Sequence, residues 1–89
     1  MTKIKVCGIT EERDAIEAVL LGVDAVGFVF WKGSPRYIPP RDAGRIVTKL
    51  PPFVACVGVF VDESPTVVMD AVRAAGLTAL KKAFEDVLG

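Results

Sequence analysis

The sequence predicts an α/β fold, with strands and helices alternating along one domain of 89 residues. Three segments rich in Val, Ile and Phe have the composition of strands, and segments of helical periodicity separate them. The second and third strand segments are almost continuously apolar, as in strands that are covered on both faces. Each connection is long enough for a crossover, so we expect the strands to be parallel.

The first element is a short strand. Side-chain alternation places Lys3, Lys5 and Cys7 on one face and Ile4 and Val6 on the other. The aliphatic pair is expected to pack against helices, so the lysines and the thiol should line the opposite face. Two interpretations of the lysines stay open: positive charge that favours the thiolate of Cys7, or edge charge that discourages aggregation. The expected strands are residues 3–7, 25–30 and 54–61.

Helices are expected between and after these strands. Thr10 and Gly22 are the predicted caps of the first, and Pro51 ends the second because proline lacks the amide donor. Ser64 is the predicted N-cap of the third, which ends at Gly76. The expected helices are residues 11–21, 41–50 and 65–75.

Crossover handedness then predicts the topology. Right-handed connections between neighbouring strands in the order 1-2-3 place every helix on the same side of the sheet. This βαβαβα arrangement is a slice of a (β/α) barrel whose other sheet face is uncovered. Apolar residues at helical spacing in the tail predict a C-terminal helix over residues 78–88. Either that helix or a second copy of the chain is expected to cover the open sheet face.

Composition excludes several classes of function. Eleven basic residues balance eleven acidic ones, so neither a nucleic acid nor a membrane surface is expected as a partner. The longest apolar run, residues 53–61, is too short to span a bilayer. The amino terminus lacks the apolar core of a signal peptide, so we expect a cytoplasmic protein. Two cysteines and no histidine give no zinc-finger spacing and no Cys-His pair, and we expect no metal or cofactor.

Cys7 is the main candidate for chemistry. It lies at the carboxyl end of a strand, where the functional groups of parallel α/β proteins gather. A cysteine there is either an acid–base group or a small buried hydrophobe. Cys56 lies in the middle of a strand and is expected in the core. Two strand spacings, about 10 Å, separate the two cysteines, too far for a disulfide.

Six segments, in order, resemble the amino-terminal part of phosphoribosylanthranilate isomerase, an enzyme of tryptophan biosynthesis built as a TIM barrel. The resemblance covers about residues 3–76, which we treat as isomerase-like β/α units, and it excludes residues 77–89. The segments include Lys5-Val6-Cys7-Gly8-Ile9-Thr10, Gly22-Val23-Asp24-Ala25-Val26-Gly27-Phe28-Val29-Phe30 and Ser34-Pro35-Arg36-Tyr37-Ile38. The others are residues 14–15, 50–54 and 57–61.

This resemblance implies an Amadori rearrangement of N-(5-phosphoribosyl)anthranilate, a phosphorylated sugar–anthranilate substrate, without a cofactor. It implies that Cys7 is the general base that removes the C2 proton of the sugar. A thiol suits this role where nearby positive charge favours the thiolate. It also implies that Arg36, in the loop after the second strand, contacts the anthranilate carboxylate through its planar guanidinium.

The tail departs from the family pattern, because the expected helix stands where the family has a fourth strand. The family's general acid and phosphate-binding half have no counterpart in the 89 residues. Two hypotheses follow. The chain is a family fragment that is not catalytically competent in isolation, or it is a non-catalytic engineered or excised α/β scaffold. The scaffold would fold autonomously or by self-association, and a homodimer is the expected assembly.

Overall fold

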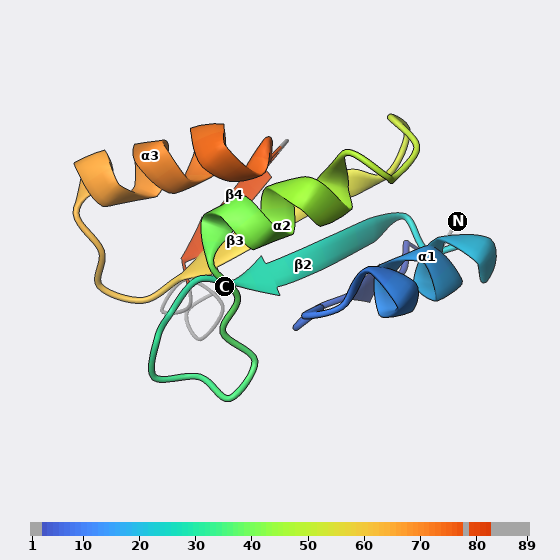
Figure 1. Ribbon diagram of the computed structural model, residues 1–89, viewed down its shortest axis with the longest axis horizontal. Helices are drawn as coiled ribbons and strands as arrows, with labels where there is room; N and C mark the ends of the chain where they lie inside the picture. The colour runs from blue at the N-terminus through green and yellow to red at the C-terminus, as the bar shows by residue number, and fades with distance from the viewer. Residues whose placement is uncertain (1–2, 78, 83–89) are drawn as a thin grey trace.

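The described residues form a four-stranded parallel sheet with three helices on one face (Figure 1). The computed structural model describes residues 3–77 and, for the backbone alone, residues 79–82. The strands lie in the order β1-β2-β3-β4, which confirms the predicted order of the first three. The elements are β1 (Lys5–Val6), α1 (Glu12–Leu20), β2 (Ala25–Val29), α2 (Pro40–Val47), β3 (Ala55–Phe60), α3 (Pro65–Ala75) and β4 (Ala79–Lys82).

The prediction of a helix over residues 78–88 is wrong for residues 79–82, which form β4. This strand pairs in parallel with β3, with Val57 opposite Ala79 and Phe60 opposite Lys82. An unpaired strand edge offers a row of backbone donors and acceptors, and pairing with it outweighs the helical periodicity of four residues. Most of the apolar stripe that predicted the helix lies in residues 83–89, outside the described residues.

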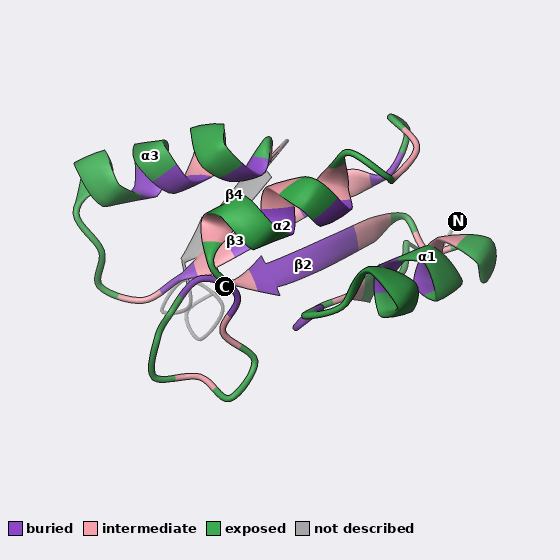
Figure 2. Ribbon diagram, in the orientation of Figure 1, coloured by how far each residue is buried: buried purple, intermediate pink, exposed green. Residues whose placement is uncertain are grey.

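The core lies between the sheet and the helices (Figure 2). Val26 and Phe28 of β2 are fully buried, and the register places Cys56 of β3 beside Val26 on the same face. Phe30 stacks on Phe28 with ring centroids 6.5 Å apart and meets Phe60 at 5.4 Å. The helices contribute mostly small side chains to this core: Ala15, Ala18, Ala43, Ile46, Val68, Ala71 and Ala75. Small side chains let the helices lie close to the aromatic row.

The cap predictions hold for one helix and fail for another. Ser64 is the N-cap of α3, and its Oγ accepts a hydrogen bond from the amide of Val67 at 3.3 Å. Gly76 ends α3 in the left-handed conformation, as predicted. The N-cap of α1, however, is Glu11 rather than Thr10, and its side chain makes no capping hydrogen bond. Helix α1 therefore begins one residue later than the capping residue type suggested.

The other side of the sheet has no helix over it within the described residues. We call this surface the open face. Alternation and strand register assign to it Lys5, Cys7, Ala25, Gly27, Val29, Ala55, Val57 and Val59. Its valines are only partly buried, whereas the valine and phenylalanines that β2 and β3 direct to the other face are buried. Val6 packs against the core as expected, but Ile4 is 53% exposed, because β1 is an edge strand that begins only at Lys5.

None of the helices in the described part of the chain is long and apolar enough to span a membrane.

Candidate functional site

The carboxyl ends of the parallel strands lie side by side along one rim of the sheet, which we call the edge of the sheet below, and Cys7 lies there. It follows β1 directly, and its thiol is exposed. The loop that follows β2 starts at the same edge and carries Arg36. Neither Cys7 nor Cys56 is in a disulfide. The sequence prediction that Cys7 and Arg36 share one edge of the sheet agrees with this arrangement.

The backbone around Cys7 is fastened to β2 at Gly27. The carbonyl oxygen of Gly27 accepts hydrogen bonds from the amides of Gly8 at 3.0 Å and Ile9 at 3.1 Å. The thiol lies directly over the same glycine, since a Cβ atom built on Gly27 would be 2.9 Å from the Sγ atom of Cys7. The thiol therefore rests against bare backbone of the neighbouring strand.

A short turn orders the loop that carries Arg36. The Oγ atom of Ser34 accepts the amide of Arg36 at 3.0 Å, and the Ser34 carbonyl accepts the amide of Tyr37 at 3.1 Å. The loop then returns to β2, where the amide of Ile38 donates to the carbonyl of Val29 at 3.1 Å. Strand β2 thus anchors both the segment after Cys7 and the loop of Arg36.

The side chain of Arg36 reaches back to the segment after Cys7. A Cβ atom built on Gly8 would be 2.9 Å from the Cδ atom of Arg36 and 3.5 Å from one guanidinium nitrogen. Gly8 has a φ of +86°, a conformation that favours glycine, so both the turn and the contact require this residue. The Arg36 side chain therefore lies against Gly8, the residue that directly follows Cys7.

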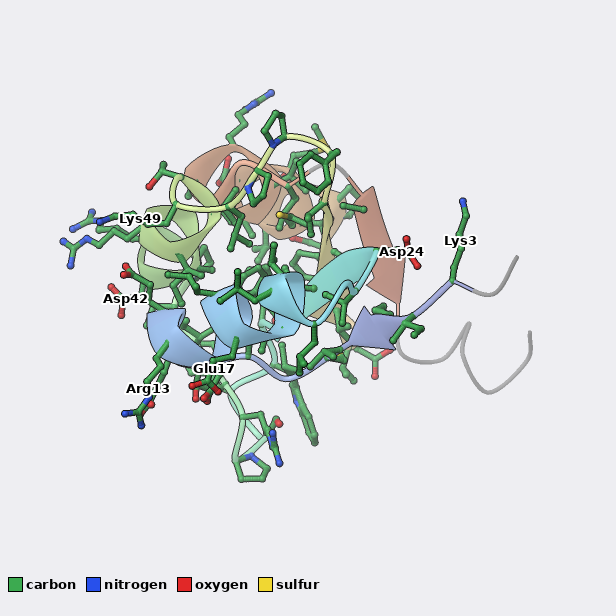
Figure 3. All side chains as sticks on the ribbon, turned by 90° about the vertical axis from the view of Figure 1, so that its right-hand side faces the viewer. Lys3, Arg13, Glu17, Asp24, Asp42 and Lys49 are labelled. Carbon is green, nitrogen blue, oxygen red and sulfur yellow. The ribbon has the colours of Figure 1, made fainter. Side chains whose placement is uncertain are left out.

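Cys7 and Arg36 also line the same surface hollow, of about 340 Å³. Asp14 and Glu17 of α1 line it as well and give the hollow an acidic wall in addition to the cationic Arg36. Lys5 lies on the open face with Cys7, whereas Lys3 extends away from the rest of the chain (Figure 3). Lys3 lies before β1, so alternation along this strand assigns only Lys5 to the face of Cys7, and both interpretations of the lysines stay predictions.

Cys56 has a different environment, as the sequence predicted. It lies within β3 and is 3% exposed. Burial raises the pKa of its thiol. Cys7 is therefore the thiol that is both accessible and at the carboxyl ends of the strands. Across residues 3–77 and 79–82, no three His, Cys, Asp or Glu side chains are grouped so as to hold a metal ion.

Sequence reasoning missed Gly8 and Gly27 as parts of the site. A signal existed for Gly27, because a glycine inside an apolar strand often marks a close approach of another backbone or a ligand. Its partner could not be read from the sequence, since the contact depends on the register of β1 against β2.

Comparison with known proteins adds a match to one family. Residues 4–81 match the family described as N-(5′-phosphoribosyl)anthranilate (PRA) isomerase. The match continues beyond residue 76 and into β4. An N-(5′-phosphoribosyl)anthranilate isomerase of Trichlorobacter lovleyi is 55% identical over 73 residues, which are 82% of this chain and 36% of the relative. The corresponding protein of Thermotoga petrophila is 51% identical over 81 residues, 91% of this chain and 40% of the relative.

Solved structures agree. The phosphoribosylanthranilate isomerase of Thermotoga maritima superposes with a TM-score of 0.90 at 50% identity, covering 92% of this chain and 40% of that one. A second structure, in complex with reduced 1-(o-carboxyphenylamino)-1-deoxyribulose 5-phosphate, also has a TM-score of 0.90 and covers 42% of that chain. The fold is thus part of a TIM barrel, and the chain spans about two fifths of the length of these relatives. It belongs to the phosphoribosylanthranilate isomerase family.

Proposed function

We propose that this chain supplies the amino-terminal part of a phosphoribosylanthranilate isomerase site, in which Cys7 is the general base and Arg36 binds the substrate carboxylate. The observation that carries the proposal is the placement of both groups around Gly8, at the edge of the sheet. A base and a carboxylate-binding group must lie within the length of one small substrate. Cys7 precedes Gly8, Arg36 packs against Gly8, and both residues line one hollow, which supports that requirement.

The proposed substrate is N-(5-phosphoribosyl)anthranilate and the reaction is its Amadori rearrangement, a step of tryptophan biosynthesis. A general acid protonates the ring oxygen of the ribose, and the ring opens to a Schiff base. The thiolate of Cys7 then takes the proton from C2, and the C2–H electron pair forms the enolamine, which tautomerises to the ketone. No electrons leave the substrate, so the reaction needs no redox cofactor.

Arg36 would hold the anthranilate carboxylate through two parallel N–H donors. Ser34 supports this role indirectly, because its hydroxyl and carbonyl order the turn from which Arg36 extends. The acidic wall formed by Asp14 and Glu17 would repel a second negative group, so the substrate phosphate is expected to point away from α1.

We propose further that the 89 residues alone do not complete the reaction. The motifs shared with the family are those of the base and the carboxylate contact, and none corresponds to the general acid or the phosphate site. A general acid contributes about 10²–10⁴-fold to a rate. Conversion by the chain alone within about tenfold of a relative's rate would contradict this proposal.

The partly exposed valines of the open face support self-association of the isolated chain. The Thermotoga maritima isomerase is described as dimeric, and a homodimer would cover the open faces of two copies of this chain. Sedimentation velocity should give a dimer that Val57→Lys converts to a monomer. Val67→Lys, at an exposed position of α3, is the matched control and should remain dimeric. A monomeric unsubstituted chain would refute the dimer. As a member of a biosynthetic family, the protein is expected in the cytoplasm.

The roles of Cys7 and Arg36 can be tested in a chimera. Residues 4–81 would replace the matching segment of the Thermotoga maritima enzyme, and conversion would be followed by fluorescence. Arg36→Met should raise KM by roughly 10- to 100-fold, the equivalent of hydrogen bonds to a charged group. Arg73→Met, at an exposed arginine of α3, should leave KM unchanged. Equal effects of the two substitutions would refute the role of Arg36.

The same chimera tests Cys7. Cys7→Ser should lower kcat by about 10²–10⁴-fold, because a hydroxyl is a far poorer base. Cys56→Ala changes the other cysteine and should leave kcat close to that of the unsubstituted chimera. Unchanged activity of Cys7→Ser would refute its role as the base.

A further inference from the structure

We infer that Gly27 is the positioning residue of Cys7: its carbonyl fixes the chain after the thiol, and its missing side chain makes room for the sulfur. The significance of this position for catalysis rests on the proposed function of Cys7, whereas the contacts between Gly27 and Cys7 are independent of that function.

Two independent contacts join Gly27 to the Cys7 segment. The Gly27 carbonyl accepts both the Gly8 amide at 3.0 Å and the Ile9 amide at 3.1 Å, which holds the turn that begins at Cys7. A Cβ atom on Gly27 would be 2.9 Å from Sγ and 3.3 Å from both Cα and Cβ of Cys7. Backbone hydrogen bonds alone would tolerate any residue at position 27. The close contacts favour glycine, because a methyl group there would force the sulfur, Cα and Cβ atoms of Cys7 to shift.

A methyl group at position 27 would displace the thiol. Non-bonded carbon atoms are at optimal separation at about 3.5–4.0 Å, and sulfur is larger, so Sγ would have to move by at least about 0.6 Å. The contacts to Cα and Cβ prevent simple rotation from relieving all of the overlap, and β1 would shift with the sulfur. A displacement of about 1 Å in a reacting group can lower a rate roughly 10²-fold.

Gly58 provides a matched control in the next strand. It pairs with Phe28 in the register of β2 and β3 and therefore faces the helices, away from Cys7. A Cβ atom there would be 2.5 Å from the Leu77 side chain and 2.9 Å from the Phe30 ring. Gly58→Ala thus crowds a strand position at least as strongly as Gly27→Ala, but it does so in the core.

The experiment measures alkylation of Cys7 by iodoacetamide as a function of pH in the 89-residue chain, with the labelled cysteine assigned by mass spectrometry. Gly27→Ala should change the rate constant for alkylation of Cys7 by about threefold or more at one or more pH values. The reason is that the reactivity of a thiol depends on the surroundings of its thiolate. Gly58→Ala should leave that profile unchanged even if it lowers stability. A Gly27→Ala profile that overlays the unsubstituted one, or equal changes in both variants, would overturn the inference.

A thermodynamic cycle covers the case in which Gly27→Ala does not fold well enough to label. Cys7→Gly removes the Sγ and Cβ atoms that the new methyl group would meet. Gly27→Ala should therefore lower the melting temperature less in the Cys7→Gly background than in the unsubstituted chain. Equal losses in the two backgrounds would overturn the inference. Neither measurement needs turnover, so failure of Cys7 as a catalytic base in the chimera would leave these results unaffected.

Discussion

Gly44→Ala tests the packing of α2 against α3, where two effects of similar size oppose each other. Gly44 lies in the middle of α2, and a Cβ atom there would be 2.5 Å from the carbonyl oxygen of Ala74 and 3.4 Å from the Cα atom of Ala75. Both of these are backbone atoms, which cannot rotate away. The two helices would have to separate.

Helix propensity favours the substitution, by about 1 kcal/mol for Gly to Ala in a helix interior. Overpacking a close contact costs about 1–3 kcal/mol, and separating the helices also loosens the buried side chains of Ile46 and Ala75. The overpacking term should win, with a net loss of about 1 kcal/mol. In a domain of this size that lowers Tm by about 4–8 °C.

Thermal unfolding followed by circular dichroism measures the net effect, and Ala74→Gly calibrates the propensity. Ala74 is exposed in α3, so its replacement by glycine should cost about 1 kcal/mol through propensity alone. A rise in Tm for Gly44→Ala, equal and opposite to the loss for Ala74→Gly, would mean that the helices do not approach each other as the structure has them.

Three further predictions concern single side chains. Cys7 should react with a maleimide faster than Cys56, because Cys56 is buried within β3; preferential labelling of Cys56, seen by mass spectrometry, would contradict the strand register. Ser64→Ala should lower the free energy of unfolding in urea by about 1 kcal/mol through loss of the N-cap, whereas Ser64→Thr keeps the oxygen and should cost little. Burial raises the pKa of Cys56 above its ordinary value of 9.0, so the folded chain holds this proton more tightly than the unfolded chain. That contribution to stability is complete below pH 9.0 and is lost as the pH rises through the folded-state pKa; Cys56→Ala should remove the loss, and identical pH dependence in both proteins would refute it.

The sequence predicted the central elements well because their signals were strong and local. The apolar runs of β2 and β3 placed each strand to within one residue, and Ser64 marked the start of α3. Helix α2 ends at Val47 rather than at residue 50, because a proline at position 51 clashes with the carbonyl of the residue four positions before it. Strand β4 was missed because pairing with the edge of β3 determines it.

In the site, too, local sequence signals were predictive and contacts between distant segments were not. Strand-end position, together with the family resemblance, selected Cys7 and Arg36, and the structure places the Arg36 side chain against Gly8, the residue after Cys7. The glycines that set this spacing could not be chosen from the sequence, because their contacts depend on how β1 aligns with β2 and on where the loop after β2 returns. The catalytic roles of both residues remain predictions.

The most direct test of the account is the ratio of kcat for Cys7→Ser to kcat for Cys56→Ala in the chimera that carries residues 4–81. Both variants change one cysteine of the same unit, but only one changes the thiol at the edge of the sheet. We predict a ratio of about 10⁻² to 10⁻⁴, the contribution of a general base. A ratio near one, with both variants folded, would show that the thiol of Cys7 is not the base.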